Sequence, residues 1–180
     1  SHKPDPRVVE IVVDQQSLDF VAEAGMGWPF PRDEVYGRVA KFLATAGAHA
    51  VAFDILFSET SPRGVKDDLA FQASLKEAKL VVLAAELQGG DTARVTGTPE
   101  NQAWQTARRR AAYSRWTLDL QRSLLPRPFE RPDVLLPHAD PPGTPDGVDL
   151  GAQVLSVASV SAAAGPGHVF RSILPVVAFP

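Results

Sequence analysis

Residues 33–54, DEVYGRVAKFLATAGAHAVAFD, decide the fold because they place a helix directly before a buried strand. Apolar side chains recur at the spacing of one helix face, at Val35, Val39, Phe42, Leu43 and Ala46. This spacing predicts an amphipathic helix over residues 33–46. Gly47 is a typical residue for the end of such a helix, and AVAFD at 50–54 is typical of a strand buried on both faces. The segment therefore predicts part of an α/β sheet.

An aliphatic run precedes this segment. Residues 7–14, RVVEIVVD, are rich in β-branched side chains and end in Asp14, which predicts a first buried strand. A short helix, QQSLDFVAE, and a turn, GMGWPFPR, connect the run to the helix at 33–46. Strand, helix and strand follow one another without a hairpin signal. This order favours a right-handed βαβ unit with two parallel strands.

The same alternation continues after residue 54. Residues 65–78 predict a helix whose first turn carries Asp67 and Asp68, and acidic side chains are favourable at the positive end of the helix dipole. LVVLAA at 80–85 predicts a third strand of the parallel sheet.

The pattern breaks between residues 87 and 151, where a polar connector and a proline-rich stretch enclose an expected helix at 100–124. One side of that helix carries an apolar stripe, formed by Ala112, Tyr113, Trp116, Leu120 and Leu124. Two further strands are expected at 154–160 and 172–179, joined by a glycine and proline turn as an antiparallel pair at the sheet edge.

The predicted fold class is α/β, in a single domain that covers residues 1–180. It has a mainly parallel sheet built from βαβ units with flanking helices, an antiparallel C-terminal strand pair, and a helical and proline-rich insertion. The core is expected from residues 7–86 and 152–179, and the insertion from about 87–151. Whether the insertion folds alone or docks on the sheet stays open.

Composition narrows the class of protein. A length of 180 residues with 44% hydrophobic residues suits one domain with an ordinary core. A net charge of −3 gives no reason to expect nucleic acid as a partner. The absence of cysteine excludes disulfides, a thiol nucleophile and zinc–cysteine sites. No stretch is apolar enough to span a bilayer, and because the only methionine is Met26 we expect a piece of a longer protein.

Two aspartates are the first candidate site residues. Asp14 and Asp54 each end a predicted parallel strand, and ligands of open α/β sheets bind outside the carboxyl ends of the strands. Their carboxylates are suited to a cation or to the hydrogen-bond donors of a polar ligand. The alternative is that each caps the following loop or helix through backbone N–H groups.

A stiff turn supplies a second group of candidates. Trp28 and the prolines beside it lead into Arg32, a shape suited to one wall of a pocket with Arg32 as the anion-binding group, or else to a structural corner. Glu59, with Asp67 and Asp68, has the oxygen ligands of a cation site, although such residues also cap helices. The expected ligand-binding residues are Asp14, Ser17, Trp28, Arg32, Asp54 and Glu59. Metal binding stays open, and neither a catalytic residue nor a cofactor is predicted.

Three blocks of the sequence resemble the CHASE2 family. They are IVVDQQSLDF at 11–20, GWPFPRDEVYGRVAKFLATAGAHAVAFDILFSE at 27–59, and DDLAFQASLKEAKLVVLA at 67–84. The WPFPR turn and the AGAHAVAFDILFSE block are the most specific parts, because a generic βαβ unit does not require these residue types. The resemblance resumes at 165–179, where the aspartate usual before the glycine is missing.

The resemblance implies an extracytoplasmic sensory domain in a bacterial transmembrane receptor. Such domains precede the membrane helices of nucleotide cyclases, histidine kinases, serine/threonine kinases and diguanylate cyclases. It implies an unknown small-molecule ligand, a membrane attachment through flanking helices, a homodimer in the full receptor, and no catalysis. Two alternatives remain. One is a structural or dimerising protein-interaction ectodomain that uses the stripe around Trp116, and the other is a metal-assisted hydrolase that uses Asp14 and Asp54.

Overall fold

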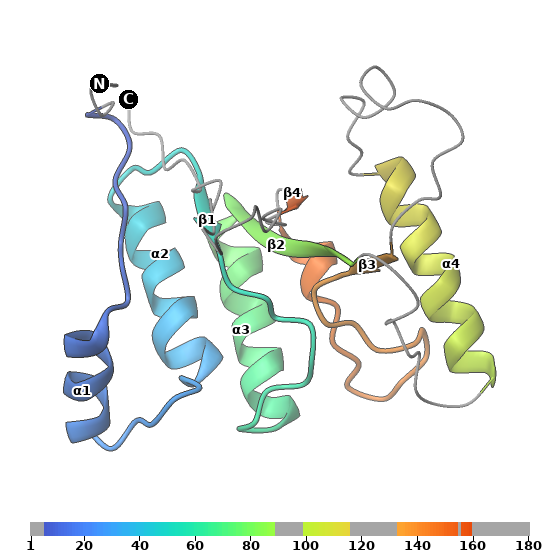
Figure 1. Cartoon of the computed structure of the whole chain (residues 1–180), viewed down its shortest axis with the longest axis horizontal. Coiled ribbons are helices and arrows are strands. Elements are labelled where there is room, and N and C mark those ends of the chain that lie inside the picture. The colour runs from blue at the N-terminus through green and yellow to red at the C-terminus, as the bar shows by residue number, and fades with distance from the viewer. Residues whose placement is uncertain (1–5, 89–98, 116–132, 155, 160–180) are drawn as a thin grey trace, which may run out of the picture.

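A computed structural model describes residues 6–88, 99–115, 133–154 and 156–159 of the chain (Figure 1). The elements follow in this order: α1 (Gln15–Glu23), the π-helix η1 (Arg32–Gly37), α2 (Arg38–Thr45), β1 (Val51–Phe53), α3 (Val65–Ala78), β2 (Val81–Gln88), α4 (Pro99–Arg115), β3 (Asp133–Leu135), the 3₁₀-helix η2 (Leu150–Gln153) and β4 (Ser156–Ser159). No helix in these ranges is long and apolar enough to span a bilayer.

The sheet is centred on β2. β1 and β4 lie on opposite sides of β2, and both pair with it in parallel, with Val51 opposite Val81 and Ser156 opposite Val82. β3 is antiparallel to the far end of β2, where Leu135 lies opposite Glu86. The predicted parallel pairing of the strands at 50–54 and 80–85 is confirmed, and α3 joins them.

The predicted helices before β2 are present. α1 is the QQSLDFVAE segment, η1 and α2 together span the helix expected at 33–46, and α3 has the predicted bounds 65–78. These helices form because their apolar side chains recur at helical spacing and because acidic side chains occupy the first turn of α3. α4 covers the first part of the helix expected at 100–124, and the stripe around Trp116 lies outside the residues whose side chains are described.

The first predicted strand is absent from the sheet. Val8 forms a single bridge, and residues 9–14 have no regular secondary structure. The aliphatic side chains of this run are exposed, from 36% for Val8 to 63% for Val12. The prediction of a buried strand at 7–14 was therefore wrong for this structure, because the same β-branched pattern is compatible with any extended backbone and only a neighbouring strand makes it a ladder.

The C-terminal pairing also differs from the expectation. β4 lies inside the range 154–160, but its partner is β2 and the two strands are parallel. The predicted partner at 172–179 lies outside the described residues. The antiparallel strand is instead β3, which comes from the expected insertion.

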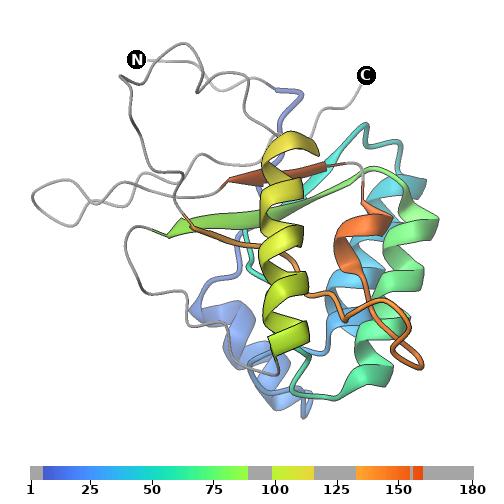
Figure 2. The same ribbon diagram turned by 90° about the vertical axis from the view of Figure 1, so that its right-hand side faces the viewer.

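The described part of the expected insertion docks on the sheet and the helices. The N–H of His138 donates to the carbonyl of Phe57 at 2.6 Å, and the N–H of Leu150 donates to the carbonyl of His138 at 3.1 Å. Val148 and Leu150 are buried in the main core. Across the molecule the elements run from α1 through α2 and α3 to the loop before η2 and to α4, as Figures 1 and 2 show. The insertion is thus part of the domain's packing.

The main core lies between the helices and the sheet. Its buried residues are Phe30, Tyr36, Ala40, Phe57, Phe71, Leu75, Ala78, Val81, Leu83, Val148 and Leu150. Phe57 lies at its centre, with ring centroids 5.2 Å from Tyr36 and 5.0 Å from Phe71. Gly37 lets η1 approach α3, because a Cβ at this position would lie 3.0 Å from the Cβ of Ser74.

Candidate ligand-binding site

Asp14 caps the N-terminus of α1. Its Oδ1 accepts hydrogen bonds from the N–H of Ser17 at 2.9 Å and from the Ser17 hydroxyl at 2.8 Å. These bonds lower the pKa of Asp14, the one from the Ser17 N–H most strongly, because they stabilise the charged carboxylate. Asp14 and Ser17 are therefore brought together as an exposed helix cap, and their role in ligand binding stays a prediction.

Arg32 is a buried residue with internal partners. The residue as a whole is 7% exposed, and its Nη1 donates to Oδ1 of Asp68. Its Nη2 donates to the backbone carbonyl of Glu59 at 2.7 Å, and the guanidinium lies 5.3 Å from the ring centroid of Phe57. The structure brings Arg32 and Glu59 together, although through the backbone of Glu59, whose side chain is exposed. Their ligand-binding role also stays a prediction.

Asp67 fastens the loop after β1 to the start of η1. Its carboxylate accepts the N–H of Arg32 at 2.8 Å, the N–H of Asp33 at 3.0 Å and the hydroxyl of Ser61 at 2.6 Å. Burial pushes the pKa of Asp67 upward, but the Ser61 hydroxyl, the two N–H groups and the Arg32 charge outweigh it and lower the pKa below its ordinary value.

Both carboxylate oxygens of the neighbouring Asp68 also accept hydrogen bonds. Oδ1 accepts from the Arg32 guanidinium, and Oδ2 accepts from the N–H of Ser61 at 2.8 Å. Asp67 and Asp68, two of the three acidic residues considered as cation ligands, are thus hydrogen-bonded within the protein, whereas the side chain of the third, Glu59, is exposed. Among the described residues no three His, Asp or Glu side chains form a group that could hold a metal ion.

Trp28 and Asp54 line an apolar groove of about 490 Å³. Residues 9–13 line it from one segment, and the other lining residues come from one face of the η1–α2 helix, from β1 and from the residues that follow β1. Trp28 is 63% exposed and packs edge-to-face on Phe30, with centroids 5.2 Å apart. Asp14 is not among the lining residues, so the two strand-end aspartates do not face one cavity.

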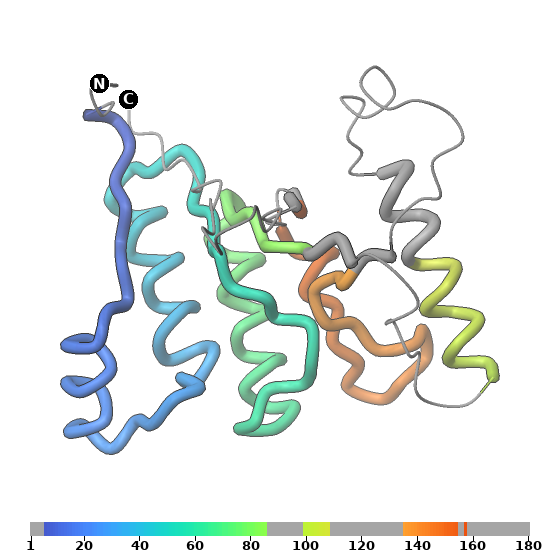
Figure 3. Tube along the Cα trace, viewed as in Figure 1, coloured from blue at the N-terminus to red at the C-terminus, as the bar shows by residue number. Residues whose placement is uncertain are grey.

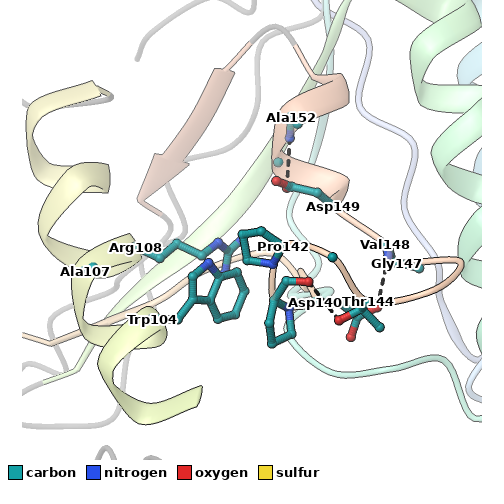
Figure 4. A pocket seen from close by; sticks show the side chains of 13 residues that line it. Trp104, Ala107, Arg108, Asp140, Pro142, Thr144, Gly147, Val148, Asp149 and Ala152 are labelled. Carbon is teal, nitrogen blue, oxygen red and sulfur yellow. Dashed lines mark hydrogen bonds between the residues drawn. The ribbon is translucent and has the colours of Figure 1, made fainter. Parts of the chain in front are cut away.

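A second cavity, of about 610 Å³, lies between α4 and residues 140–152. Figure 4 shows Trp104 and Arg108 extending from α4 toward Asp140, Pro142 and Thr144 of this loop. The walls combine an indole ring, a guanidinium and carboxylates, and they are more polar than those of the groove. This combination suits a small polar ligand. We call this cavity the polar pocket.

Hydrogen bonds fix the walls of the polar pocket. Arg108 donates from Nη2 to the carbonyl of Pro137 at 2.5 Å, and its guanidinium lies 5.7 Å from the ring centroid of Trp104. Oδ2 of Asp140 accepts the N–H of Val148 at 2.9 Å, which closes the loop on itself. The loop is also tied to α3, because the N–H of Asp149 donates to Oε1 of Gln72 at 2.6 Å.

The sequence reasoning missed this pocket because its residues lie in the segment assigned to an insertion. Two signals were present. The run PHADPPGTPDGVD at 137–149 is rich in residues that form tight turns, which indicates an ordered loop. Trp104 and Arg108 are four residues apart on one helix and so lie on the same face.

A scan against protein-family models finds the CHASE2 domain over residues 1–177. The chain belongs to the CHASE2 family. This match confirms the resemblance to the family that the sequence indicated. CHASE2 domains are extracellular sensory domains of signalling receptors. A search of the curated proteins gave no match, and a search of the solved structures gave none either.

The specific blocks of the CHASE2 resemblance have clear structural roles. In the WPFPR turn, Trp28 lines the apolar groove, Phe30 is buried in the core and Arg32 donates a hydrogen bond to Asp68. The AVAFDILF stretch provides β1 and then Phe57 at the centre of the core. In this CHASE2 domain, these residues hold the helices against the sheet, and Trp28, Phe53 and Asp54 also line the apolar groove.

Proposed function

We propose that this CHASE2 domain is the extracytoplasmic sensor of a bacterial transmembrane receptor, and that it detects a small polar molecule in the polar pocket. The output domain belongs to one of the receptor classes with CHASE2 sensors, which are nucleotide cyclases, histidine kinases, serine/threonine kinases and diguanylate cyclases. Flanking membrane helices would anchor the domain, and a homodimer would carry the signal. The observation that carries the proposal is the convergence of Trp104, Arg108 and Asp149 from distant segments on one cavity.

The pocket suits a sensory ligand in size and chemistry. Its volume of about 610 Å³ falls in the range of small-molecule sites, about 300–1,000 Å³. The indole ring of Trp104 offers a flat apolar surface, while Asp149, Thr144 and Arg108 offer polar groups around it. A ligand with hydroxyl, amino or carboxylate groups on a small carbon frame would use both.

The position of the pocket suggests how binding would be transmitted. One wall is α4, and the other is a loop whose Val148 and Leu150 are buried in the main core and whose Asp149 is hydrogen-bonded to Gln72 of α3. A ligand that bridges the walls favours the conformation in which they are close, and a sensor requires such a difference in affinity between two conformations. The change in the position of the loop would be transmitted to the sheet through α3.

We further propose that the domain catalyses nothing. The hydrolase alternative needs Asp14 and Asp54 at one reaction centre, whereas the Asp14 carboxylate is the cap of α1 and only Asp54 lines the groove. The structural alternative, a dimerising ectodomain, is supported by a different observation. Large apolar side chains are exposed at Val12, Phe20 and Phe42, with exposed fractions of 63%, 73% and 70%.

A thermal-shift screen of the purified domain against amino acids, sugars, organic acids, nucleotides and metal ions tests the sensory proposal. A ligand at about 100 times its dissociation constant stabilises the fold by about 2.7 kcal/mol. We expect a ligand whose effect is lost in Trp104→Ala and in Thr144→Val but kept in the matched groove variant Trp28→Ala.

The opposite pattern, loss in Trp28→Ala and Asp54→Asn only, would move the ligand to the apolar groove. If no compound raised the melting temperature and the domain self-associated as its concentration rose, the sensory role would be contradicted and the dimerising ectodomain favoured.

A further inference from the structure

The two walls of the polar pocket carry charges of opposite sign. α4 contributes the guanidinium of Arg108, and the loop contributes the carboxylates of Asp140 and Asp149. Among the described lining residues, α4 supplies no acidic side chain and the loop supplies no basic one. Figure 3 shows the two walls side by side, the loop before η2 in orange and the described part of α4 in yellow. The pocket therefore has a positive side and a negative side.

Asp149 is the carboxylate that is accessible to a ligand. The residue is exposed, and its Oδ1 accepts the N–H of Ala152 at 3.1 Å, which caps η2. A carboxylate has acceptor positions for about four hydrogen bonds, so this cap leaves further capacity for a ligand. The N–H of Asp149 donates to Oε1 of Gln72 at 2.6 Å, and this bond fixes the residue relative to α3.

Asp140 is more fully engaged within the loop. Its Oδ2 accepts the N–H of Val148 at 2.9 Å, and its Oδ1 lies 3.6 Å from Nε2 of His138. These contacts set the shape of the loop. Asp140 therefore adds negative charge to this side of the pocket, while Asp149 is the carboxylate with capacity for a ligand.

Arg108 is held in place on the opposite wall. Its Nη2 donates to the carbonyl of Pro137 at 2.5 Å, and its guanidinium lies 5.7 Å from the ring centroid of Trp104. A guanidinium stays protonated in proteins and matches the geometry of a carboxylate. A permanent positive charge is thus fixed beside the cavity.

A ligand with both charges fits these walls better than a ligand with one charge or none. A neutral sugar would take the charged side chains out of water without supplying opposite charges, which is costly. A simple amine would meet the like charge of Arg108, and a simple carboxylate would meet the like charges of the loop. Trp104, Ala107 and Pro142 provide apolar surface for the carbon atoms of the ligand.

We propose that the ligand of the polar pocket is a small zwitterion, of which an α-amino acid is the simplest form. Its ammonium group binds at Asp149 on the loop, and its carboxylate binds at Arg108 on α4. The ligand joins the two walls because one small frame carries both charges. This proposal rests on the sensory function proposed above, since it names the ligand class of the same pocket.

Thermal shift and titration calorimetry of the whole chain with three matched forms of each L-amino acid are the first test. The forms are the amino acid, its N-acetyl derivative without the ammonium group, and its amide without the carboxylate. At about pH 6 the amino groups are protonated. We expect at least one amino acid to bind, and both of its derivatives to bind at least about tenfold more weakly, because each has lost a charge-assisted hydrogen bond.

Dipeptides form a second arm of this experiment, because they carry the same two charges further apart. Binding of a dipeptide and of no single amino acid would support the zwitterion class and assign it to short peptides. Equal binding of an amino acid and its two derivatives would overturn the proposal, since neither charge would then be recognised.

Substitution of two aspartates of the loop locates the ammonium group. Asp149→Asn removes the charge but keeps an oxygen that caps η2, so the fold should persist. We expect the amino acid to bind at least about tenfold more weakly to this variant, and the N-acetyl form to bind as it does to the parent. Asp146→Asn is the matched control, because Asp146 is exposed, does not line the pocket and has a φ of 53° that asparagine tolerates.

Asp146→Asn should bind the amino acid as the parent chain does. Equal weakening by the two substitutions would contradict an ammonium site at Asp149. A sugar or organic acid that stabilises the parent but not Trp104→Ala, with no response to any zwitterion, would overturn the ligand class and leave the sensory pocket standing. If no compound of any class binds, the sensory function itself fails, and the zwitterion fails with it.

Discussion

The guanidinium of Arg32 and the carboxylate of Asp68 form a buried ion pair that joins the start of η1 to the first turn of α3. The side chains are 8% and 0% exposed. Both side chains make a further hydrogen bond inside the protein. Nη2 of Arg32 donates to the Glu59 carbonyl, and Oδ2 of Asp68 accepts from the Ser61 N–H. Removal of one partner would leave an uncompensated charge inside the protein.

We therefore expect Asp68→Ala to lower the free energy of unfolding by about 3–5 kcal/mol, measured by urea denaturation. The exposed pair Lys41–Glu77, with its charged atoms 3.8 Å apart, is the matched control. Glu77→Ala should cost about 0–1 kcal/mol, since water screens that pair. Equal effects of the two substitutions would contradict the role assigned to the buried pair.

Gly37 sets the distance between η1 and α3. An added Cβ would lie 2.5 Å from Oδ1 of Asp33 and 3.0 Å from the Cβ of Ser74. We expect Gly37→Ala to destabilise the domain, since overpacking costs about 1–3 kcal/mol and exceeds the gain of about 1 kcal/mol from better helix propensity. Gly27→Ala is the control, because nothing lies within 4 Å of its added Cβ. Thermal denaturation of both variants provides the measurement. If Gly37→Ala raised the melting temperature, η1 and α3 would have to separate easily.

Asp67 makes the stability depend on pH in the acid range. Its pKa in the folded domain is below the ordinary value of 3.8, so its contribution is complete above that value and is lost as the pH falls through the folded pKa. We expect Asp67→Asn to be less stable than the parent at neutral pH and to show a weaker loss of stability below about pH 4.

Ser61→Ala removes a hydroxyl that lowers this pKa, so the folded pKa moves closer to the unfolded value, and the loss of stability in acid should be smaller and end at a higher pH than in the parent. Urea midpoints recorded across the acid range provide the measurement. Parallel curves for the parent and Asp67→Asn would show that other groups control the acid response.

Substitutions at Asp14 distinguish a structural role in capping α1 from a role in ligand binding. Asp14→Ala removes the acceptor for the Ser17 N–H, so we expect the N-terminal amides of α1 to exchange faster with solvent, while Asp14→Ser keeps the cap and the slower exchange. Neither variant should alter the response to a ligand of the polar pocket, because Asp14 is not one of its lining residues. A ligand response that disappears in both variants would assign Asp14 a binding role.

Local patterns were sufficient for the helices before β2. The spacing of Val35, Val39 and Leu43 and the acidic first turn of α3 each act within a few residues, and the observed helices follow them. The strands β1 and β2 were also predictable, since their aliphatic runs are short and bounded by helix ends. The run at 7–14 has the same composition, yet it lies outside the sheet in this structure.

The candidate site was less predictable. Arg32 after a rigid turn has the appearance of an anion-binding residue, and only the fold brings Asp68 and the Glu59 carbonyl to its guanidinium. The polar pocket depends on contacts between α4 and a loop far along the chain, which no local pattern encodes.

The sequence by itself determined the family, the helices before β2 and the strands β1 and β2, because periodicity, caps and specific blocks of residues are properties of neighbouring positions. The tertiary structure alone decided which strands pair, which charges are neutralised and that Trp104 and Asp149 line one cavity. Strand pairing, charge compensation and cavities are relationships between distant segments, and they come into existence only when the chain has folded.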